Sequence, residues 1–180
     1  MKLYSYVVKH DDGFAPNPFW GYCTLACCKP KIRKSAQVGD WVVGTGAVKN
    51  TGRDKLIFAM KVTEKLTFAQ YSKDNRFKNK IPSSGRNELL GDNIYYQDKD
   101  EKWIQRKALF HQTDKERGRD LSGKYVLVSD HYCYFGKKAI ATPEEFKAVI
   151  KKSPNHKCNF DSNFVDSFIR WLSDKIGTKP

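Results

Sequence analysis

Apolar residues along this chain follow strand-like patterns more often than helical ones. Most β-prone runs are bounded by turn-forming residues, and the runs cover residues 3–8, 41–45, 56–62, 94–96, 103–104 and 124–135. The turn dipeptide Gly39-Asp40 leads into the second run, which we expect to form a hairpin or meander with the third. Residues 109–123 are charged and predict no regular element. Because no regular helical crossovers separate the runs, the pattern predicts a mainly antiparallel, barrel-like sheet.

Helical signals are concentrated late in the chain. Thr142-Pro143-Glu144-Glu145 combines a cap, a proline at the first helical position and two acids, which predicts a helix over 143–151. Asp161 is expected to cap a final helix, because apolar residues recur at helical spacing over 164–172. A shorter helix is expected to begin at Thr67. Together with the strands, these elements predict an α+β fold with late packing helices.

Length and composition predict one folded domain. The chain has 180 residues, 39% of them hydrophobic and 13% aromatic, which is enough for a core. We expect a single domain over 1–180, with a β-rich core over 1–136 and helices over 137–180. No apolar run approaches the roughly 18 residues of a membrane span, so no membrane partner is expected. Five cysteines without an export signal predict reduced thiols and a cytoplasmic protein.

The charge balance predicts a polyanionic partner. Lysine and arginine total 33 against 20 acidic residues, giving a formal net charge of +13. Such an excess favours association with nucleic acid or a nucleotide. The alternative is a lysine-rich surface that only keeps the protein soluble, because net charge governs association and not fold.

The stretch 14–46 carries the densest set of recognition side chains. Two prolines stiffen its start, and rings lie beside amide and hydroxyl groups. Flat apolar faces next to such groups suit a nucleobase. The residues we expect to hold a base are Phe14, Asn17, Phe19, Trp20, Thr24, Trp41 and Thr45. Trp41 suits a buried core equally well, and Asp40 could hydrogen-bond a base edge or simply shape the turn.

Basic side chains continue this pattern in two places. One is the run 29–34, and the other is the polar loop 74–86, which also contains Lys80 and Arg86. Cations in such loops are suited to the phosphate backbone. The residues we expect to bind phosphate are Lys29, Arg33, Lys73, Arg76 and Lys78.

Candidates for catalysis are scattered, and no spacing brings them together. They are His10, Cys23, Asp92 and His131. Cys23 could act as a nucleophile with His10 as its base, but a thiol also needs an oxyanion site that spacing cannot reveal. Cys27 and Cys28 are expected to be small buried hydrophobes. The cysteine spacing does not repeat as a zinc site requires, so no metal or cofactor is expected.

Several segments resemble a known family. The most distinctive are FAPNPF, CTLACCKPKIR and GDWVVGTG, and the matching segments extend over residues 3–136. They resemble the nucleotide-modification-associated domain family, type 2. The resemblance implies a link with bacterial and phage systems that modify DNA bases, and it assigns a catalytic role to none of the residues of this chain. The order of strands is also similar to that of PUA- and EVE-like barrels, which grip flipped or modified bases.

Three functions are consistent with these features. The first is a module that binds nucleic acid, DNA rather than RNA, or a nucleotide, with a base held in the aromatic and amide pocket. The second is an enzyme that modifies a base or nucleotide. The third is a non-catalytic subunit that positions a DNA-modifying enzyme. The sequence favours the first and leaves the other two open.

Overall fold

The computed structural model describes residues 1–48, 52–83, 85, 88–151 and 155–180. Their contacts divide the chain into two compact units, each built from separate stretches of sequence. The first unit contains Met1–Asp11, Ala36–Thr63 and Ser129–Pro180, and the second contains Asp12–Ser35 and Glu64–Val128. We describe each unit by itself, and the single domain expected over 1–180 stays a prediction.

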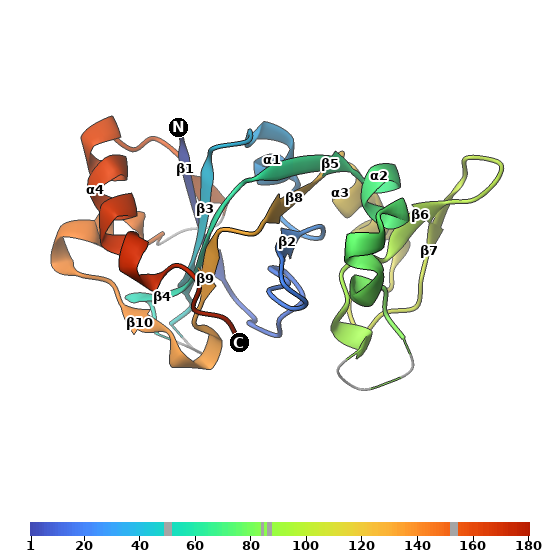
Figure 1. Ribbon diagram of the computed structural model, residues 1–180, viewed down its shortest axis with the longest axis horizontal. Coiled ribbons are helices and arrows are strands. Elements are labelled where there is room, and N and C mark those ends of the chain that lie inside the picture. Colours follow the sequence, from blue (N-terminus) through green and yellow to red (C-terminus); the bar gives the residue numbers. More distant parts are fainter. Residues whose placement is uncertain (49–51, 84, 86–87, 152–154) are drawn as a thin grey trace. The chain divides into compact units, whose positions relative to one another are not determined.

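The first unit is built on a mixed sheet (Figure 1). Its strands are β1 (Leu3–Val8), β3 (Trp41–Gly46), β4 (Lys55–Lys61), β9 (Tyr132–Tyr134), β10 (Ile140–Ala141) and β11 (His156–Lys157). The order is β10-β4-β3-β1-β11, and β9 also pairs with β4. β1 and β3 run parallel, whereas β3 and β4 form the predicted antiparallel pair. Gly44 is required in β3, because a Cβ there would lie 2.3 Å from the Phe58 ring.

One helix completes the core of this unit. It is α4 (Ser162–Leu172), and it begins as predicted at Asp161, whose carboxylate accepts hydrogen bonds from the next backbone N–H groups. Val165, Phe168 and Leu172 pack with Leu3 and other residues of the sheet. The helix expected over 143–151 is a short 3₁₀ helix, Glu144–Val149, and two further 3₁₀ turns are Gly136–Lys138 and Ser173–Lys175.

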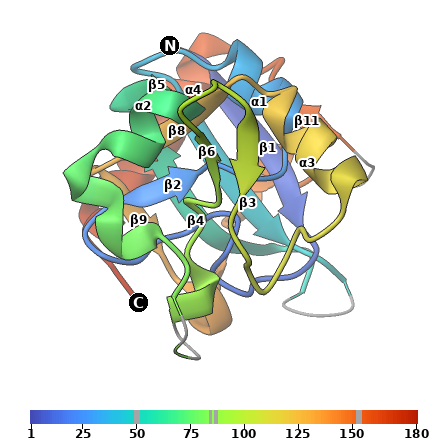
Figure 2. The ribbon, with the colours of Figure 1, turned by 90° about the vertical axis from the view of Figure 1, so that its right-hand side faces the viewer.

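The second unit combines two small sheets with short helices (Figure 2). Its strands are β2 (Cys23–Leu25), β5 (Glu64–Thr67) and β8 (Tyr125–Ser129), in the order β2-β8-β5, and the separate pair β6 (Tyr95–Gln97) and β7 (Trp103–Gln105). Its helices are α1 (Pro30–Ser35), α2 (Phe68–Lys73) and α3 (Asp114–Leu121), with 3₁₀ helices at Asn75–Lys80 and Glu88–Leu90. Thr67 caps α2 as predicted.

Two predictions about the fold need correction, and one detail is not confirmed. The run 124–135 is not one strand: Ser129 Oγ bonds the backbone N–H and carbonyl of His131, which turns the chain between β8 and β9. Residues 109–123 are not irregular, since they include α3, and helices are therefore not confined to the end of the chain. The α+β class is confirmed, but none of the three sheets formed by the described strands closes, so the barrel is not confirmed.

Among the described residues, no helix has the length and hydropathy that a bilayer-spanning segment needs.

Candidate functional site

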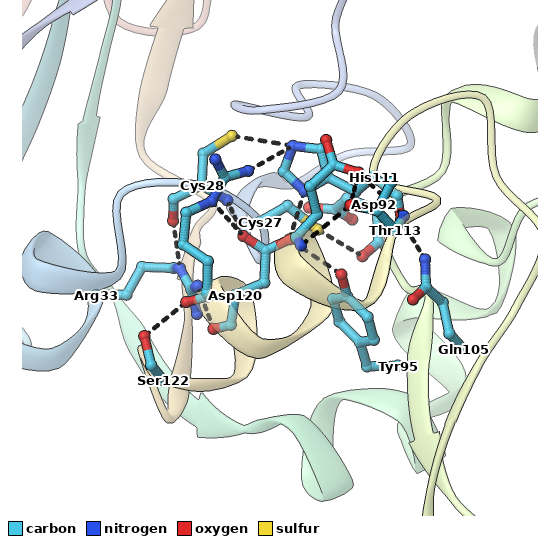
Figure 3. A network of polar contacts seen from close by, with 12 residues as sticks. Cys27, Cys28, Arg33, Asp92, Tyr95, Gln105, His111, Thr113, Asp120 and Ser122 are labelled. Atoms are coloured by element: carbon cyan, nitrogen blue, oxygen red, sulfur yellow. Dashed lines mark hydrogen bonds and ion pairs between the residues drawn. The ribbon is translucent and has the colours of Figure 1, made fainter.

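A cysteine, a histidine and an aspartate form a chain of contacts inside the second unit (Figure 3). Cys28 Sγ lies 3.3 Å from His111 Nε2, and His111 Nδ1 contacts Asp120 Oδ2. The same carboxylate accepts hydrogen bonds from the Cys28 backbone N–H at 2.8 Å and from the Tyr95 hydroxyl at 3.0 Å. A thiol next to an imidazole that a carboxylate orients is the arrangement of nucleophile, base and positioning group in cysteine enzymes.

Local backbone geometry places these side chains. Cys28 and Lys29 follow β2 with φ values of 59° and 42°, and His111 has a φ of 58°. Residues other than glycine seldom adopt this left-handed region, and each such residue costs about 1–3 kcal/mol unless its surroundings hold it there. Asp120 comes from the last turn of α3, which begins with a reciprocal cap between Thr113 and Glu116. Strain at two of the three positions is typical of functional sites.

Arg33 of α1 fixes the backbone on which the cluster is built. It is fully buried, and its guanidinium donates to three carbonyl oxygens from three segments of the unit. Nε donates to the carbonyl of Cys28 at 2.8 Å, Nη1 to that of Tyr125 at 2.7 Å and Nη2 to that of Asp120 at 2.5 Å. Arg33 is therefore a positioning residue, because it joins the backbone of Cys28 to the backbone of Asp120.

The electrostatics of the cluster make His111 a strong base. Burial lowers its pKa, but hydrogen bonds to Asp120 and Cys28 and the charge of Asp120 outweigh burial and raise the pKa to about 9. The imidazole side chain is 10% exposed and the Asp120 side chain is 0% exposed. The nearby Arg119 guanidinium also faces the ring, with Nη2 3.4 Å from Nε2. The site thus combines a half-buried thiol with a base of raised pKa.

This pKa predicts that the free energy of unfolding falls as the pH rises from 6.5 to about 9. Folding raises the pKa of His111 above its ordinary value of 6.5, so the ring binds its proton more tightly in the folded state than in the unfolded state. Its contribution is therefore fully present below pH 6.5 and is lost as the pH rises through 9. Because the ring is partly exposed, we expect this contribution to the free energy of unfolding to be about 1–2 kcal/mol. Urea unfolding at several pH values measures this dependence.

The matched control is His111→Gln, which removes the titrating group. Its free energy of unfolding should depend less on pH over the same interval. An equal dependence in the two proteins would contradict the assignment of the raised pKa to His111.

Two residues of the cluster, His111 and Asp120, form with Cys27 the one group in the described part of the chain whose spacing is compatible with a metal ion. Ligand atoms of Cys27, His111 and Asp120 lie within 4.8 Å of one another. Two features favour a hydrogen-bonded cluster instead. His111 Nδ1 contacts the Asp120 carboxylate directly, and burial raises the pKa of the Cys27 thiol well above its usual value, whereas a metal requires the thiolate.

Comparison with known protein families identifies the family of this chain. The family model described as nucleotide modification associated domain 2 matches residues 1–179. The chain belongs to this family. The match continues through the C-terminal helix beyond the segments recognised in the sequence, and it confirms the family that those segments resemble. No curated protein and no solved structure matched.

In this nucleotide modification associated domain, some residues expected to hold a base are joined in a buried polar network. Asn17 and Thr24 exchange two backbone hydrogen bonds of 2.8 Å, and the Thr24 hydroxyl donates to Asp92. The Asn17 amide donates to the carbonyls of Gly13 and Leu90. Lys80 Nζ donates to Asn17 Oδ1 at 2.6 Å. These groups tie the loop before β2 to the rest of the unit, and a role in base recognition stays a prediction.

The aromatic residues expected to hold a base have different environments. Phe14 is buried, with its ring 5.1 Å from that of His111, which places it beside the thiol cluster. Phe19 packs edge-on against Trp20, which is 36% exposed. Trp41 and Thr45 belong to β3 in the first unit, where both are buried.

The residues expected to bind phosphate divide into two groups. Lys73, Arg76 and Lys78 are exposed, and Lys29 is half-buried. Arg33 is assigned the structural role above, because its three hydrogen bonds go to backbone carbonyls in a buried site. Lys80 is also buried, and burial lowers its pKa to about 8. Arg86 lies outside the described residues.

The catalytic candidates from the sequence do not form the cluster. Cys23 and Asp92 are fully buried in the second unit, and His10 and His131 are exposed in the first. Cys28, expected to be a buried hydrophobe, is half-buried and contacts an imidazole. His111 and Asp120 were missed, and the available signal was the spacing Thr113-x-x-Glu116, which marks the start of the helix that carries Asp120.

Proposed function

We propose that this protein is a thiol-dependent enzyme that acts on a base or nucleotide. Cys28 is the nucleophile, His111 is its general base, and Asp120 positions the imidazole. The observation that carries the proposal is the continuous contact from Cys28 Sγ through the two ring nitrogens of His111 to the Asp120 carboxylate. Membership of a family associated with nucleotide modification supports a base or nucleotide as the substrate.

The chemistry follows from the order of these groups. With the Nδ1–H donated to Asp120, Nε2 takes the thiol proton of Cys28, and the raised pKa of His111 favours the protonated imidazole beside the sulfur. Sulfur then forms a bond to an electrophilic carbon of the base, and the π electron pair of that carbon's double bond moves to the neighbouring atom. His111 returns its proton to that atom. The reverse elimination restores both the thiol and the double bond, so no redox partner is needed.

Other features of the chain support a nucleic-acid substrate. Lys73 and Lys78 are exposed cations, and the whole chain carries a formal charge of +13, whereas the exposed Arg76 is already paired with Glu64 and Asp74. Trp20 offers a partly exposed ring on which a base could stack. The same features support the second candidate, a binding module without catalysis. The two candidates differ in the role of Cys28: the enzyme needs its thiol for activity, whereas the binding module does not need it to bind.

A mass-spectrometric experiment separates these candidates. The protein is incubated with single-stranded DNA, duplex DNA or free nucleotides and then acid-quenched, and the peptides and the digested nucleosides are weighed. We expect a mass increase on the Cys28 peptide from the covalent adduct, absent in Cys28→Ser and present in Cys158→Ser, which removes an exposed thiol outside the cluster. No mass change, with equal salt-dependent DNA binding by wild type and Cys28→Ser, would favour the binding module.

A further inference from the structure

Arg119 is the exposed cation of the thiol cluster. It lies in the last turn of α3, next to Asp120. Its Nη2 is 3.4 Å from His111 Nε2, the same nitrogen that Cys28 Sγ approaches to 3.3 Å. The Arg119 side chain is 50% exposed, whereas the Asp120 side chain is 0% exposed. Arg119 is therefore a solvent-exposed cation in contact with the base of the cluster.

The negative groups near Arg119 are already engaged by other donors. Asp120 Oδ1 is 3.9 Å from Arg119 Nε, and this carboxylate also accepts from His111, Tyr95 and the Cys28 backbone. Glu116, the other acid whose charge reaches Arg119, accepts hydrogen bonds from Thr113 as part of the helix cap. A guanidinium has five N–H donors and no acceptor, so the exposed face of Arg119 retains donors for an anion.

We propose that Arg119 binds an anionic group of the substrate, a phosphate of a nucleotide or nucleic acid, beside the Cys28 thiol. The proposal rests on the proposed function, because it names the chemistry of the molecule that reaches that thiol. A guanidinium pairs with phosphate through two parallel hydrogen bonds, which fix orientation as well as affinity. The phosphate would thus place the neighbouring electrophilic carbon at Cys28.

Two alkylating reagents test this without knowledge of the substrate. Iodoacetate and iodoacetamide transfer similar groups with the same leaving group, but only iodoacetate is an anion. We expect Arg119→Gln to lower the ratio of their rates at Cys28 by about fivefold, because the local positive charge is lost. Arg119→Lys should keep most of the ratio. Lys115→Gln, an exposed cation on the same helix, should leave it unchanged.

Inorganic phosphate provides the second readout. It should slow iodoacetate labelling of Cys28 in the wild type more than in Arg119→Gln. An unchanged rate ratio in Arg119→Gln, together with equal protection by phosphate in both proteins, would overturn the role of Arg119. That result would leave the proposed function standing if labelling still required His111, so the two failures are distinguishable.

Discussion

Replacing His111 by Gln should slow alkylation of Cys28 by iodoacetamide at neutral pH by about 10–100-fold. The thiolate, and not the thiol, is the nucleophile in this reaction. In the wild type, His111 Nε2 lies 3.3 Å from the sulfur and can take its proton, and its Nδ1 is held by Asp120. Glutamine has no basic nitrogen and cannot take that proton. Peptide-resolved mass spectrometry over time measures the rate at each cysteine separately.

Two other thiols of the chain serve as controls. Cys158 is exposed, and its rate should be the same in the wild type and in His111→Gln. Cys27 is adjacent to Cys28 but fully buried, so Cys27→Ser should leave the Cys28 rate within about twofold. Equal Cys28 rates in wild type and His111→Gln would mean that the imidazole does not act as a base, and the proposed enzyme would be refuted.

Much of the fold could be predicted because its signals are local. β1, β3 and β4 are short apolar runs bounded by turn residues, and the caps at Thr67 and Asp161 each act within one helical turn. The turn between β8 and β9 was missed because residues on both sides of it have strand propensity. What breaks the run is a hydrogen-bonded Ser129, which propensity alone does not reveal.

The candidate site could not be predicted because it depends on long-range contacts. Cys28 lies 83 positions from His111 and 92 from Asp120, so no spacing in the sequence links them. The helix that supplies Asp120 has the sequence DKERGRDL, in which a single apolar residue gives no amphipathic period. Its stability depends on the Thr113 cap and on packing of Leu121 against the core of the second unit.

Charge was also a poor guide to exposure at two positions. Arg33 and Lys80 lie in basic segments and were expected at the surface, yet both are buried. Long charged side chains are buried only when other groups satisfy their donors. Here the satisfying oxygens of Arg33 come from residues as far away as Tyr125, so burial follows from the tertiary structure.

Replacing Arg33 by Met should lower the free energy of unfolding by about 3–5 kcal/mol. Methionine fills a similar volume but donates no hydrogen bond, so the carbonyl oxygens of Cys28, Asp120 and Tyr125 lose their shared donor. Each unsatisfied buried polar group costs about 1–3 kcal/mol. Urea unfolding measures the loss, and Lys31→Met, at an exposed position of the same helix, should change stability by less than about 0.5 kcal/mol.

The same variant tests the role expected for Arg33 from the sequence. A phosphate-binding arginine would lose nucleic-acid affinity on substitution while the free energy of unfolding stayed nearly constant. If Arg33 is instead a buried positioning residue, its substitution lowers the free energy of unfolding, and any loss of nucleic-acid affinity follows from that loss of stability. Where Arg33→Met remains folded, Cys28 should also react more slowly with iodoacetamide, because the carbonyls that Arg33 joins belong to both Cys28 and Asp120. If Arg33→Met lowered the free energy of unfolding by less than about 1 kcal/mol but bound DNA more weakly, Arg33 would be a phosphate-binding residue and not a structural one.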